Sequence, residues 1–557
     1  MAKNLERRKA MDLKKQQKRF RAEDIFTVLF FLCFLLQFAF LSYDCLFKME
    51  SHLGYDASAS LLKASEMTKQ NTLFIRNYLE TTSLQFDTPV PLAAFFHLFI
   101  KDLFLSYGIA LWICDIAFFV LFFHVMKSLK FSRLASVITL NLVSLSYLDV
   151  MFNNANDLGY YSCMFVNFGV CVVKMCILLM VIKVVIDLKD KEKLSRSQIV
   201  FAAATEIMLF ITALSSGFYL AVTVLLPLLV LLVVAICVKN EISILKKPSA
   251  VFLYIAVAVT VLGKLLQKYA VGFESRDSFM EMIPLEDFGK NLSSIFLGFL
   301  QLTGALPASE AGSVQVFSRN GIDHILALVI VTVLLISFVL LCRKALKNFS
   351  DAVPHAFLAI IAGLNILMFA FLKMTYSAKI FECRYLIPVL IVMILSSGIF
   401  IDSLSSRALF KYIGMTVLLI CVLGSHNLDH RLYSNRTIDT KAYDAVMKIV
   451  EEQSPDVVYG FGGDISLDLR NFRVVDTGHI YKTLAGWNPV DIFHEGGDYL
   501  YYDSLSDAPQ KNMLIVSRSS IVRVPETLLS EYTFVTSSGP YLIYMSDTNR
   551  IEQGGYV

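Results

Sequence analysis

Long apolar runs, separated by short polar and basic segments, fill most of the chain. Each run is about 20 residues long, enough for a helix to cross the hydrocarbon core of a bilayer. The first run is too long for the apolar core of a typical signal peptide, so we expect an uncleaved anchor. The pattern predicts about eleven transmembrane helices, near residues 25–46, 105–126, 134–152, 162–182, 199–214, 217–238, 249–270, 323–342, 355–373, 385–402 and 408–424.

Positive charges between the runs predict how the chain is threaded through the membrane. Residues 1–24 form a basic tail, which the positive-inside rule places in the cytoplasm. Basic clusters recur in every second connection, whereas the connections at 153–161 and 215–216 contain no Lys or Arg. With an odd number of spans, the membrane domain at 25–424 leaves the rest of the chain outside the cytoplasm.

The last segment, residues 425–557, is polar and rich in Asp, Gly, Ser and Tyr. A helical pattern over 443–452 precedes short apolar runs of the kind that form buried strands. These runs lie at 457–458, 474–475, 513–516 and 541–544. We therefore expect a small extracytoplasmic α/β domain after an α-helical polytopic membrane domain.

Two predicted outside connections, 47–104 and 271–322, are too long to be simple turns. The first has a helical pattern over 56–70, and Pro89 and Pro91 then begin a short apolar helix that we expect to end near Phe104. That helix is too short to cross the bilayer, so it should lie along the outer leaflet. The second connection contains an amphipathic stretch at 288–302. Loops of this length usually have a function.

Composition supports a membrane protein, since 56% of the residues are hydrophobic, only 17% are charged and the mean hydropathy is +0.60. The net charge of +3 gives no indication of nucleic-acid binding. All ten cysteines lie in or beside apolar runs, and no disulfide framework or CxxC metal pattern occurs. This usage fits a bacterial envelope protein, so we expect the bacterial plasma membrane.

Three short motifs lie at predicted outer ends of helices: Gly54-Tyr55-Asp56, Thr88-Pro89-Val90-Pro91-Leu92 and Arg384-Tyr385-Leu386-Ile387-Pro388. With the long first loop and the outside C-terminal domain, they give a layout that resembles the GT-C superfamily. Members of that superfamily are integral membrane glycosyltransferases that take sugars from polyprenyl-phosphate carriers on the outer face of the membrane. The chain departs from relatives that place Lys or Arg directly before the two prolines, because Asp87-Thr88 stands there.

The resemblance implies a carboxylate that deprotonates the acceptor hydroxyl and cations that stabilise the departing lipid phosphate. We assign the first role to Asp56. Alternatively, Asp56 only caps its helix, with Ser60 and Lys63 on a solvated face. Asp157 is either a second carboxylate of the site or a turn former. Several relatives use a divalent metal, but no dense cluster of ligands in this sequence requires one.

Four further residues are candidates for binding the donor phosphate: Arg384, Lys379, Tyr385 and Lys268. Arg forms two parallel hydrogen bonds to a phosphate, and basic residues are less frequent in outside loops. Lys264 lies one turn before Lys268 on the same helix face and extends the set. The alternative is that these residues anchor the protein at lipid headgroups, with Tyr385 in the interfacial aromatic belt.

Three ionisable residues, Asp115, Lys174 and Glu206, fall deep within predicted spans. In the membrane such groups must face protein or water, so Asp115 and Lys174 could neutralise each other. Alternatively, the same residues form a path for protons or ions.

Three classes of function remain open. The first is a glycosyltransferase that moves a sugar from a polyprenyl-phosphate donor to an extracytoplasmic glycan, lipid or protein. The second is a transporter or flippase for a lipid-linked glycan, which the absence of paired Gly/Pro-broken helices and of an inverted repeat disfavours. The third is a non-catalytic envelope assembly protein that binds through its C-terminal domain.

Overall fold

The computed structural model describes most of the chain. The described residues are 2–49, 55–75, 78–79, 83–145, 160–166, 170–189, 191–240, 242–271, 282–306, 315–347, 349, 352–372, 383–404, 408–434, 441–461, 480–484, 499–500 and 511–548.

The predicted polytopic helical fold is confirmed, and every predicted span contains a helix. Within the described residues, eight helices are long and apolar enough to cross a membrane. They are α1 (Ala2–Phe47, apolar from Ala22), α5 (Leu103–Ser128), α8 (Arg196–Ser216), α9 (Leu226–Lys239) with the π-helical turn η2 (Ala221–Leu225), α10 (Pro248–Tyr269), α12 (Arg319–Lys347), α13 (Val353–Phe371) and α14 (Ile387–Ser403) with the preceding 3-10 turn η7 (Cys383–Leu386).

The other three predicted spans correspond to helices that are shorter in their apolar part or carry more charge. They are α6 (Arg133–Ser144), α7 (Val170–Leu188) with the π-helical turn η1 (Ser162–Val166), and α15 (Ala408–Ser434), which is apolar over Leu409–Ser425. Helix α7 contains Lys174, Lys183 and Asp187, and Lys183 pairs with Asp187 at 2.5 Å. Its charges therefore find partners inside the protein, as charges in a membrane must.

Helix α14 forms the centre of the bundle. In its span 78% of the residues are buried, compared with 22–44% in the other seven long apolar helices. It packs against α6, α12, α13 and α7. Most side chains of α14 are apolar and buried between these helices, and the turn η7, which carries Arg384 and Tyr385, leads directly into it.

Two glycines allow neighbouring helices to approach closely. A Cβ on Gly108 of α5 would lie 1.9 Å from the carbonyl oxygen of Cys45 in α1. A Cβ on Gly263 of α10 would lie 2.8 Å from the carbonyl oxygen of Phe210 in α8. Small residues at such crossings are a common device in membrane helix packing.

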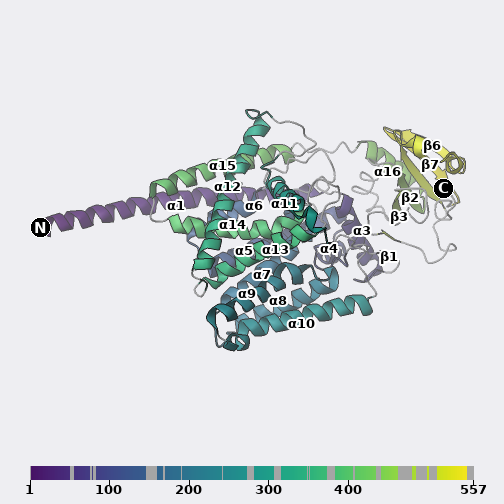
Figure 1. Ribbon diagram of the computed structural model, residues 1–557. Helices are drawn as coiled ribbons and strands as arrows, with labels where there is room; N and C mark the ends of the chain where they lie inside the picture. The colour runs from purple at the N-terminus through teal and green to yellow at the C-terminus, as the bar shows by residue number, and fades with distance from the viewer. Residues whose placement is uncertain are drawn as a thin grey trace.

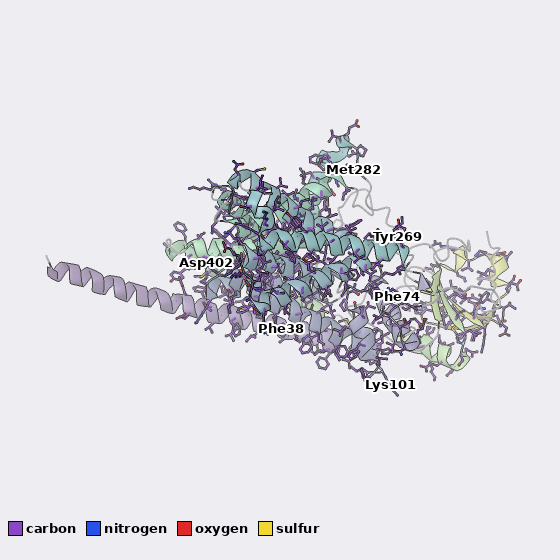
Figure 2. The ribbon with its side chains drawn as sticks, turned by 90° about the horizontal axis from the view of Figure 1, so that it is seen from below. Phe38, Phe74, Lys101, Tyr269, Met282 and Asp402 are labelled. Atoms are coloured by element: carbon purple, nitrogen blue, oxygen red, sulfur yellow. The ribbon has the colours of Figure 1, made fainter. Side chains whose placement is uncertain are left out.

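The basic tail and the C-terminal domain lie at opposite ends of the bundle (Figure 1). The tail continues α1 as a projecting helix at one end, and the helices α3 (Tyr55–Gln70) and α4 (Val90–His97) lie at the other. Figure 2 shows Tyr269, at the end of α10, near the C-terminal domain and Asp402 on the side of the tail. The placement of the two ends of the chain on different sides of a membrane stays a prediction from the sequence.

The first long loop contains the two predicted helices. Helix α3 matches the predicted 56–70 within one residue, but α4 ends at His97 rather than near Phe104. The prediction was wrong there because Asp102 caps α5, its side chain accepting a hydrogen bond from the Leu105 N–H at 3.1 Å. With eight residues, α4 is too short to cross a bilayer.

The second long loop contains α11 (Phe288–Leu302), as predicted, preceded by the 3-10 turn η5 (Leu285–Asp287). Asn291 fastens α11 to the end of α13, since its Nδ2 donates to the carbonyl oxygens of Phe369, Ala370 and Leu372 at 2.9–3.1 Å. A 3-10 turn, η3 (Ile242–Lys246), joins α9 to α10.

The C-terminal domain is a mixed sheet with a packed helix, which confirms the α/β prediction. Its strand order is β3-β2-β5-β7-β6, with β2, β3 and β5 parallel and β6 and β7 antiparallel. The predicted run at 474–475 lies outside the described residues. The elements are α16 (Lys441–Gln453), β2 (Val457–Phe461), β3 (Ile480–Leu484), β5 (Asn512–Ser517), the 3-10 turn η9 (Ile521–Arg523), α19 (Glu526–Leu529), β6 (Thr533–Ser538) and β7 (Tyr541–Ser546).

A second, two-stranded sheet links the first long loop to the C-terminal domain. Strand β1 (Tyr78–Leu79) pairs antiparallel with β4 (Tyr499–Leu500). Because β1 lies in sequence between α3 and α4, the loop that carries Asp56 and Asp87 is joined directly to the last part of the chain.

Candidate functional site

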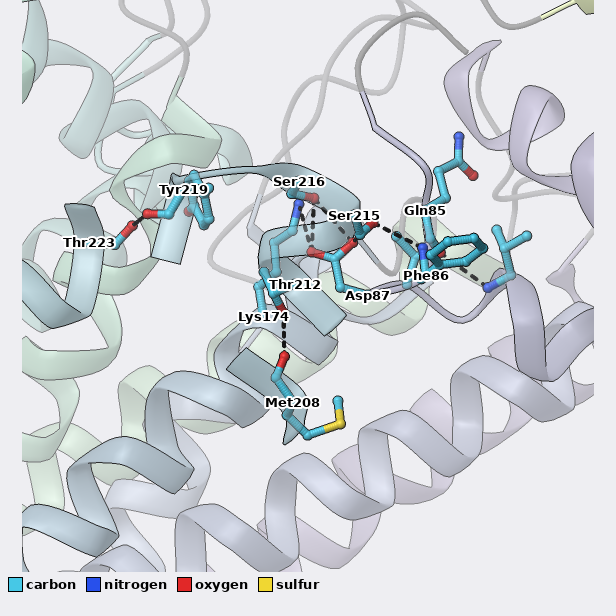
Figure 3. Close-up of polar contacts among 12 residues, drawn as sticks. Gln85, Phe86, Asp87, Lys174, Met208, Thr212, Ser215, Ser216, Tyr219 and Thr223 are labelled. Carbon is cyan, nitrogen blue, oxygen red and sulfur yellow. Dashed lines mark hydrogen bonds and ion pairs between the residues drawn. The ribbon is translucent and has the colours of Figure 1, made fainter. Parts of the chain in front are cut away.

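A buried carboxylate, Asp87, organises the polar residues at the end of the bundle that carries α3 and α4 (Figure 3). Its Oδ1 accepts a hydrogen bond from the Ser215 hydroxyl at 2.6 Å. The Ser216 hydroxyl lies 3.1 Å from Oδ1 and 2.8 Å from Oδ2, and the Lys174 ammonium lies 3.7 Å from Oδ2. The carboxylate is fully buried and Lys174 is 12% exposed, so the charge of each is compensated mainly by the other.

The two serines are in position because α8 ends there. Gly217 has a φ of +65°, which ends the helix, and its N–H donates to the carbonyl oxygen of Ala213 at 3.1 Å. The freed carbonyl oxygen of Ser215 accepts hydrogen bonds from the Leu84 N–H at 3.1 Å and from Gln267 Nε2 at 3.0 Å. The end of α8 thus holds together the first long loop and α10.

A second cation, Arg384, approaches the same place from η7. Tyr219 lies within electrostatic range of both Asp87 and Arg384, and the Lys174 ammonium is 5.2 Å from its ring centre. Cys171 of α7 is within electrostatic range of both cations. The Arg384 guanidinium stacks over Tyr385, with its carbon 5.5 Å from the ring centre. Lys174 and Arg384 thus bring two positive charges to the surroundings of Asp87 and Tyr219.

On α10, Lys264 contacts this network. The Lys264 ammonium donates to Gln267 Oε1 at 2.6 Å, and a Cβ on Gly217 would lie 3.3 Å from it. Lys268 is exposed, and its ammonium lies 6.0 Å from the ring centre of Tyr269. Lys264 therefore extends the cationic region, and the role of Lys268 stays a prediction.

Asp56 lies in the first turn of α3, and its side chain is outside the described part of the chain. Ser60 and Lys63, four and seven residues further on, are on the same helix face. Both are buried, at 2% and 0% exposure, and the Lys63 ammonium donates to the Leu84 carbonyl oxygen at 2.8 Å. The alternative in which this face is solvated is therefore wrong, because the face packs on the loop that leads to Asp87.

Two other residues named from the sequence, Asp157 and Lys379, lie outside the described residues. The expected pairing of Asp115 with Lys174 is wrong. Lys174 instead pairs with Asp87, and Asp115 lies deeper in the bundle, where the Cys45 thiol approaches its Oδ2 at 3.7 Å. The sequence contained one indication of the role of Asp87. Relatives have Lys or Arg directly before the two prolines, whereas this chain has an acid there, and that acid needs a cation nearby.

Among the described residues, no group of three or more His, Cys, Asp or Glu side chains could hold a metal ion. The carboxylates of Asp56 and Asp157 were both outside that set of side chains. A divalent cation, which several relatives use, stays an expectation from the resemblance, with no ligands assigned.

No protein-family model matches the chain, and no curated protein matches its sequence. Solved structures do match. The structure of ArnT from Cupriavidus metallidurans bound to undecaprenyl phosphate aligns over 94% of this chain and 99% of its own, with a TM-score of 0.56 and 12% identity. Its apo structure aligns over the same shares at 13% identity and the same TM-score.

The Archaeoglobus fulgidus oligosaccharyltransferase in its apo form aligns over 81% of this chain and 64% of its own, with a TM-score of 0.46 and 12% identity. The ArnT match, with a TM-score above 0.5, spans nearly the whole of both chains and identifies the fold. ArnT is a GT-C membrane glycosyltransferase. The chain therefore has the GT-C-like fold that its motifs predicted, with a small mixed sheet at its C-terminal end.

Proposed function

We propose that this protein is a membrane glycosyltransferase that moves a sugar from a polyprenyl-phosphate donor to an extracytoplasmic glycan, lipid or protein in the bacterial plasma membrane. The observation that carries the proposal is the approach of Lys174 and Arg384, more than 200 residues apart in sequence, to one polar region at the end of the bundle. The GT-C-like fold supports it, because the ArnT structure of that fold was solved with undecaprenyl phosphate.

In the proposed reaction, the acceptor hydroxyl oxygen attacks the anomeric carbon of the donor sugar. The bond from that carbon to the phosphate oxygen breaks, and the phosphate leaves with the electron pair. Asp56 takes the hydroxyl proton as general base, and Asp157 acts as a second carboxylate of the site. Asp56 suits this role because it begins the helix whose buried face packs on the Asp87 loop.

In this proposal the leaving phosphate is stabilised by Arg384, Lys379 and Lys268, with Tyr385 supporting the guanidinium. The stacking of Arg384 on Tyr385 favours a fixed orientation of its planar donors. Lys174 and Lys264 add positive charge from α7 and α10. Asp87 holds Lys174 in position through the ion pair at 3.7 Å, and in this proposal Lys174 substitutes for the base that relatives carry before the two prolines.

Undecaprenyl phosphate binding tests the phosphate site. Replacement of Arg384 by Lys keeps the charge but removes the planar fork, so affinity should fall by about 1–3 kcal/mol. Exposed Arg343, near the end of α12, provides the matched control in an Arg343→Lys variant. If the Arg384→Lys variant and the wild type bind undecaprenyl phosphate equally well, the alternative holds, in which Arg384 anchors the protein at lipid headgroups.

Transfer itself is tested with the purified full-length protein and a panel of radiolabelled undecaprenyl-phosphate sugars. Release of undecaprenyl phosphate that depends on an added envelope extract identifies an enzyme. Movement of intact donor across a vesicle membrane without release would instead identify a flippase.

A further inference from the structure

A cavity lies at the other end of the bundle, where α9 turns into α10. It has a volume of about 70 Å³ and is lined by α7, α9, η3 and the starts of α10 and α13. The cavity is far from the Asp87 network, because α10 begins at the cavity and extends to Gln267 at the network. The 22 residues of α10 correspond to about 33 Å of helix.

The walls of the cavity are apolar and its remaining residues are basic or small. Its lining residues are Val185, Lys189, Leu228, Leu231, Leu232, Ala235, Lys239, Ile244, Lys247, Ser249, Ala250, Leu253 and Val353. All of them belong to the described part of the chain, and none is acidic. A space with apolar walls and several lysines among its lining residues complements an anionic amphiphile.

Three lysines line the cavity: Lys189 directly after α7, Lys239 at the end of α9 and Lys247 directly before α10. Each is half-buried, whereas the neighbouring Lys191 and Lys246 are exposed. A half-buried lysine places its methylene stem along apolar surface and its ammonium at the edge. The cavity therefore gathers lysines that differ from the ordinary solvated lysines of the same connections.

The apolar wall continues onto the outer surface of the bundle. Leu229 and Val233 of α9 and Val251 and Ile255 of α10 are exposed apolar side chains, 44–52% accessible. In a membrane protein such side chains face lipid tails. A ligand with its head at the lysines thus has a continuous hydrocarbon surface for a tail that is longer than the cavity.

We propose that this cavity binds an anionic phospholipid of the bilayer, with the phosphate at Lys189, Lys239 and Lys247 and the first part of one acyl chain between α9 and α10. Sequence places these connections in the cytoplasm, and anionic lipids are enriched in the leaflet that faces it. The site is distinct from the proposed donor site and does not depend on glycosyl transfer.

Native mass spectrometry of the full-length protein in detergent tests the site with phosphatidylglycerol and phosphatidylcholine of identical acyl chains. The wild type should bind phosphatidylglycerol more tightly. The triple variant Lys189→Gln, Lys239→Gln and Lys247→Gln should bind it about tenfold more weakly, because each lysine near a lipid surface contributes a favourable charge interaction. Its binding of phosphatidylcholine should not change.

Two further variants make the result specific. Ala235→Trp fills the apolar part of the cavity and keeps all three lysines, so it should weaken binding of both lipids at this site. Exposed lysines that do not line the cavity provide a charge-matched control, which should leave the affinity unchanged: Lys127→Gln, Lys130→Gln and Lys347→Gln combined.

Three results would overturn the proposal. The first is a phosphatidylglycerol affinity that neither the lysine triple variant nor Ala235→Trp alters. The second is an equal loss in the control triple variant, which would mean general charge attraction. The third is complete displacement of the lipid by millimolar inorganic phosphate, which would identify a site for the free anion.

Discussion

Replacement of Asp87 by Asn tests whether the buried carboxylate holds the end of the bundle together. Asn keeps the size of the side chain and one carbonyl oxygen, which can still accept from Ser215 and Ser216. The second oxygen becomes an NH₂ group that faces the Ser216 hydroxyl, 2.8 Å from the original Oδ2, and the Lys174 ammonium at 3.7 Å. A donor then lies where an acceptor is needed, and Lys174 loses its counter-charge.

The structure sets the expected size of the effect. One hydrogen bond to a charged acceptor is lost, which costs about 1.5–3 kcal/mol. Unpairing a fully buried ion costs about 3–5 kcal/mol, but Lys174 retains 12% exposure and some hydration, so only part of that applies. We expect Asp87→Asn to lower the free energy of unfolding by about 2–4 kcal/mol.

A double-mutant cycle separates the ion pair from the hydrogen bonds. Lys174→Met removes the cation, and the double variant contains neither charge, so part of the loss in Asp87→Asn should be recovered. The interaction energy should be about 1–3 kcal/mol in favour of the native pair. Reversible unfolding of the purified protein in mixed micelles, followed by fluorescence, measures all four species.

A double variant that is no more stable than Asp87→Asn would contradict this expectation. In that case the ion pair between Lys174 and Asp87 would not contribute to stability. Undecaprenyl phosphate affinity adds an independent readout, because Asp87→Asn should weaken donor binding by displacing Lys174 even at temperatures where the variant stays folded.

Three other predictions follow from named residues. Asp56→Asn, compared at matched membrane abundance, should reduce sugar transfer by about 10²–10⁴-fold, and turnover within a few fold of wild type would show that Asp56 is not the base. Gly108→Ala should lower the free energy of unfolding by about 1–3 kcal/mol, because the new Cβ would lie 1.9 Å from the Cys45 carbonyl oxygen. Gly363→Ala, with no atom within 4 Å of the new Cβ, should be neutral or stabilising in the same assay. A periplasmic-type reporter fused after residue 557 should be active only outside the cytoplasm, and cytoplasmic activity would contradict the predicted threading.

Much of the membrane domain follows from local properties of the sequence. Apolar runs of bilayer length must form helices, because the backbone finds no other hydrogen-bond partners in hydrocarbon. Helices α11 and α16 could also be predicted from the sequence, because the amphipathic periodicity and the polar boundaries of each lie within a single stretch of chain. The predicted end of α4 was wrong because the position of the next helix, which Asp102 caps, limits how far α4 can extend.

Only part of the candidate site could be predicted from the sequence. Arg384 and Tyr385 stand out in the sequence because they begin a buried helix at a predicted outer boundary. Whether an intramembrane ion such as Lys174 pairs with Asp115 or Asp87 depends on how α7 is rotated against its neighbours, and hydropathy does not encode that rotation. The same limit applies to Lys264 and Lys268, which share a helix face but contact different surroundings.

The sequence by itself determined that this protein is a helical membrane protein with a polar α/β domain at its C-terminal end. The composition of each stretch of chain decides whether it is stable in lipid or in water. Only the tertiary structure decided which distant residues meet: Asp87 with the end of α8, Lys63 with Leu84, and three lysines around one cavity. Those contacts arise from the close packing of side chains between helices far apart in the chain, and single-sequence periodicity fixes a helix face but not its partner.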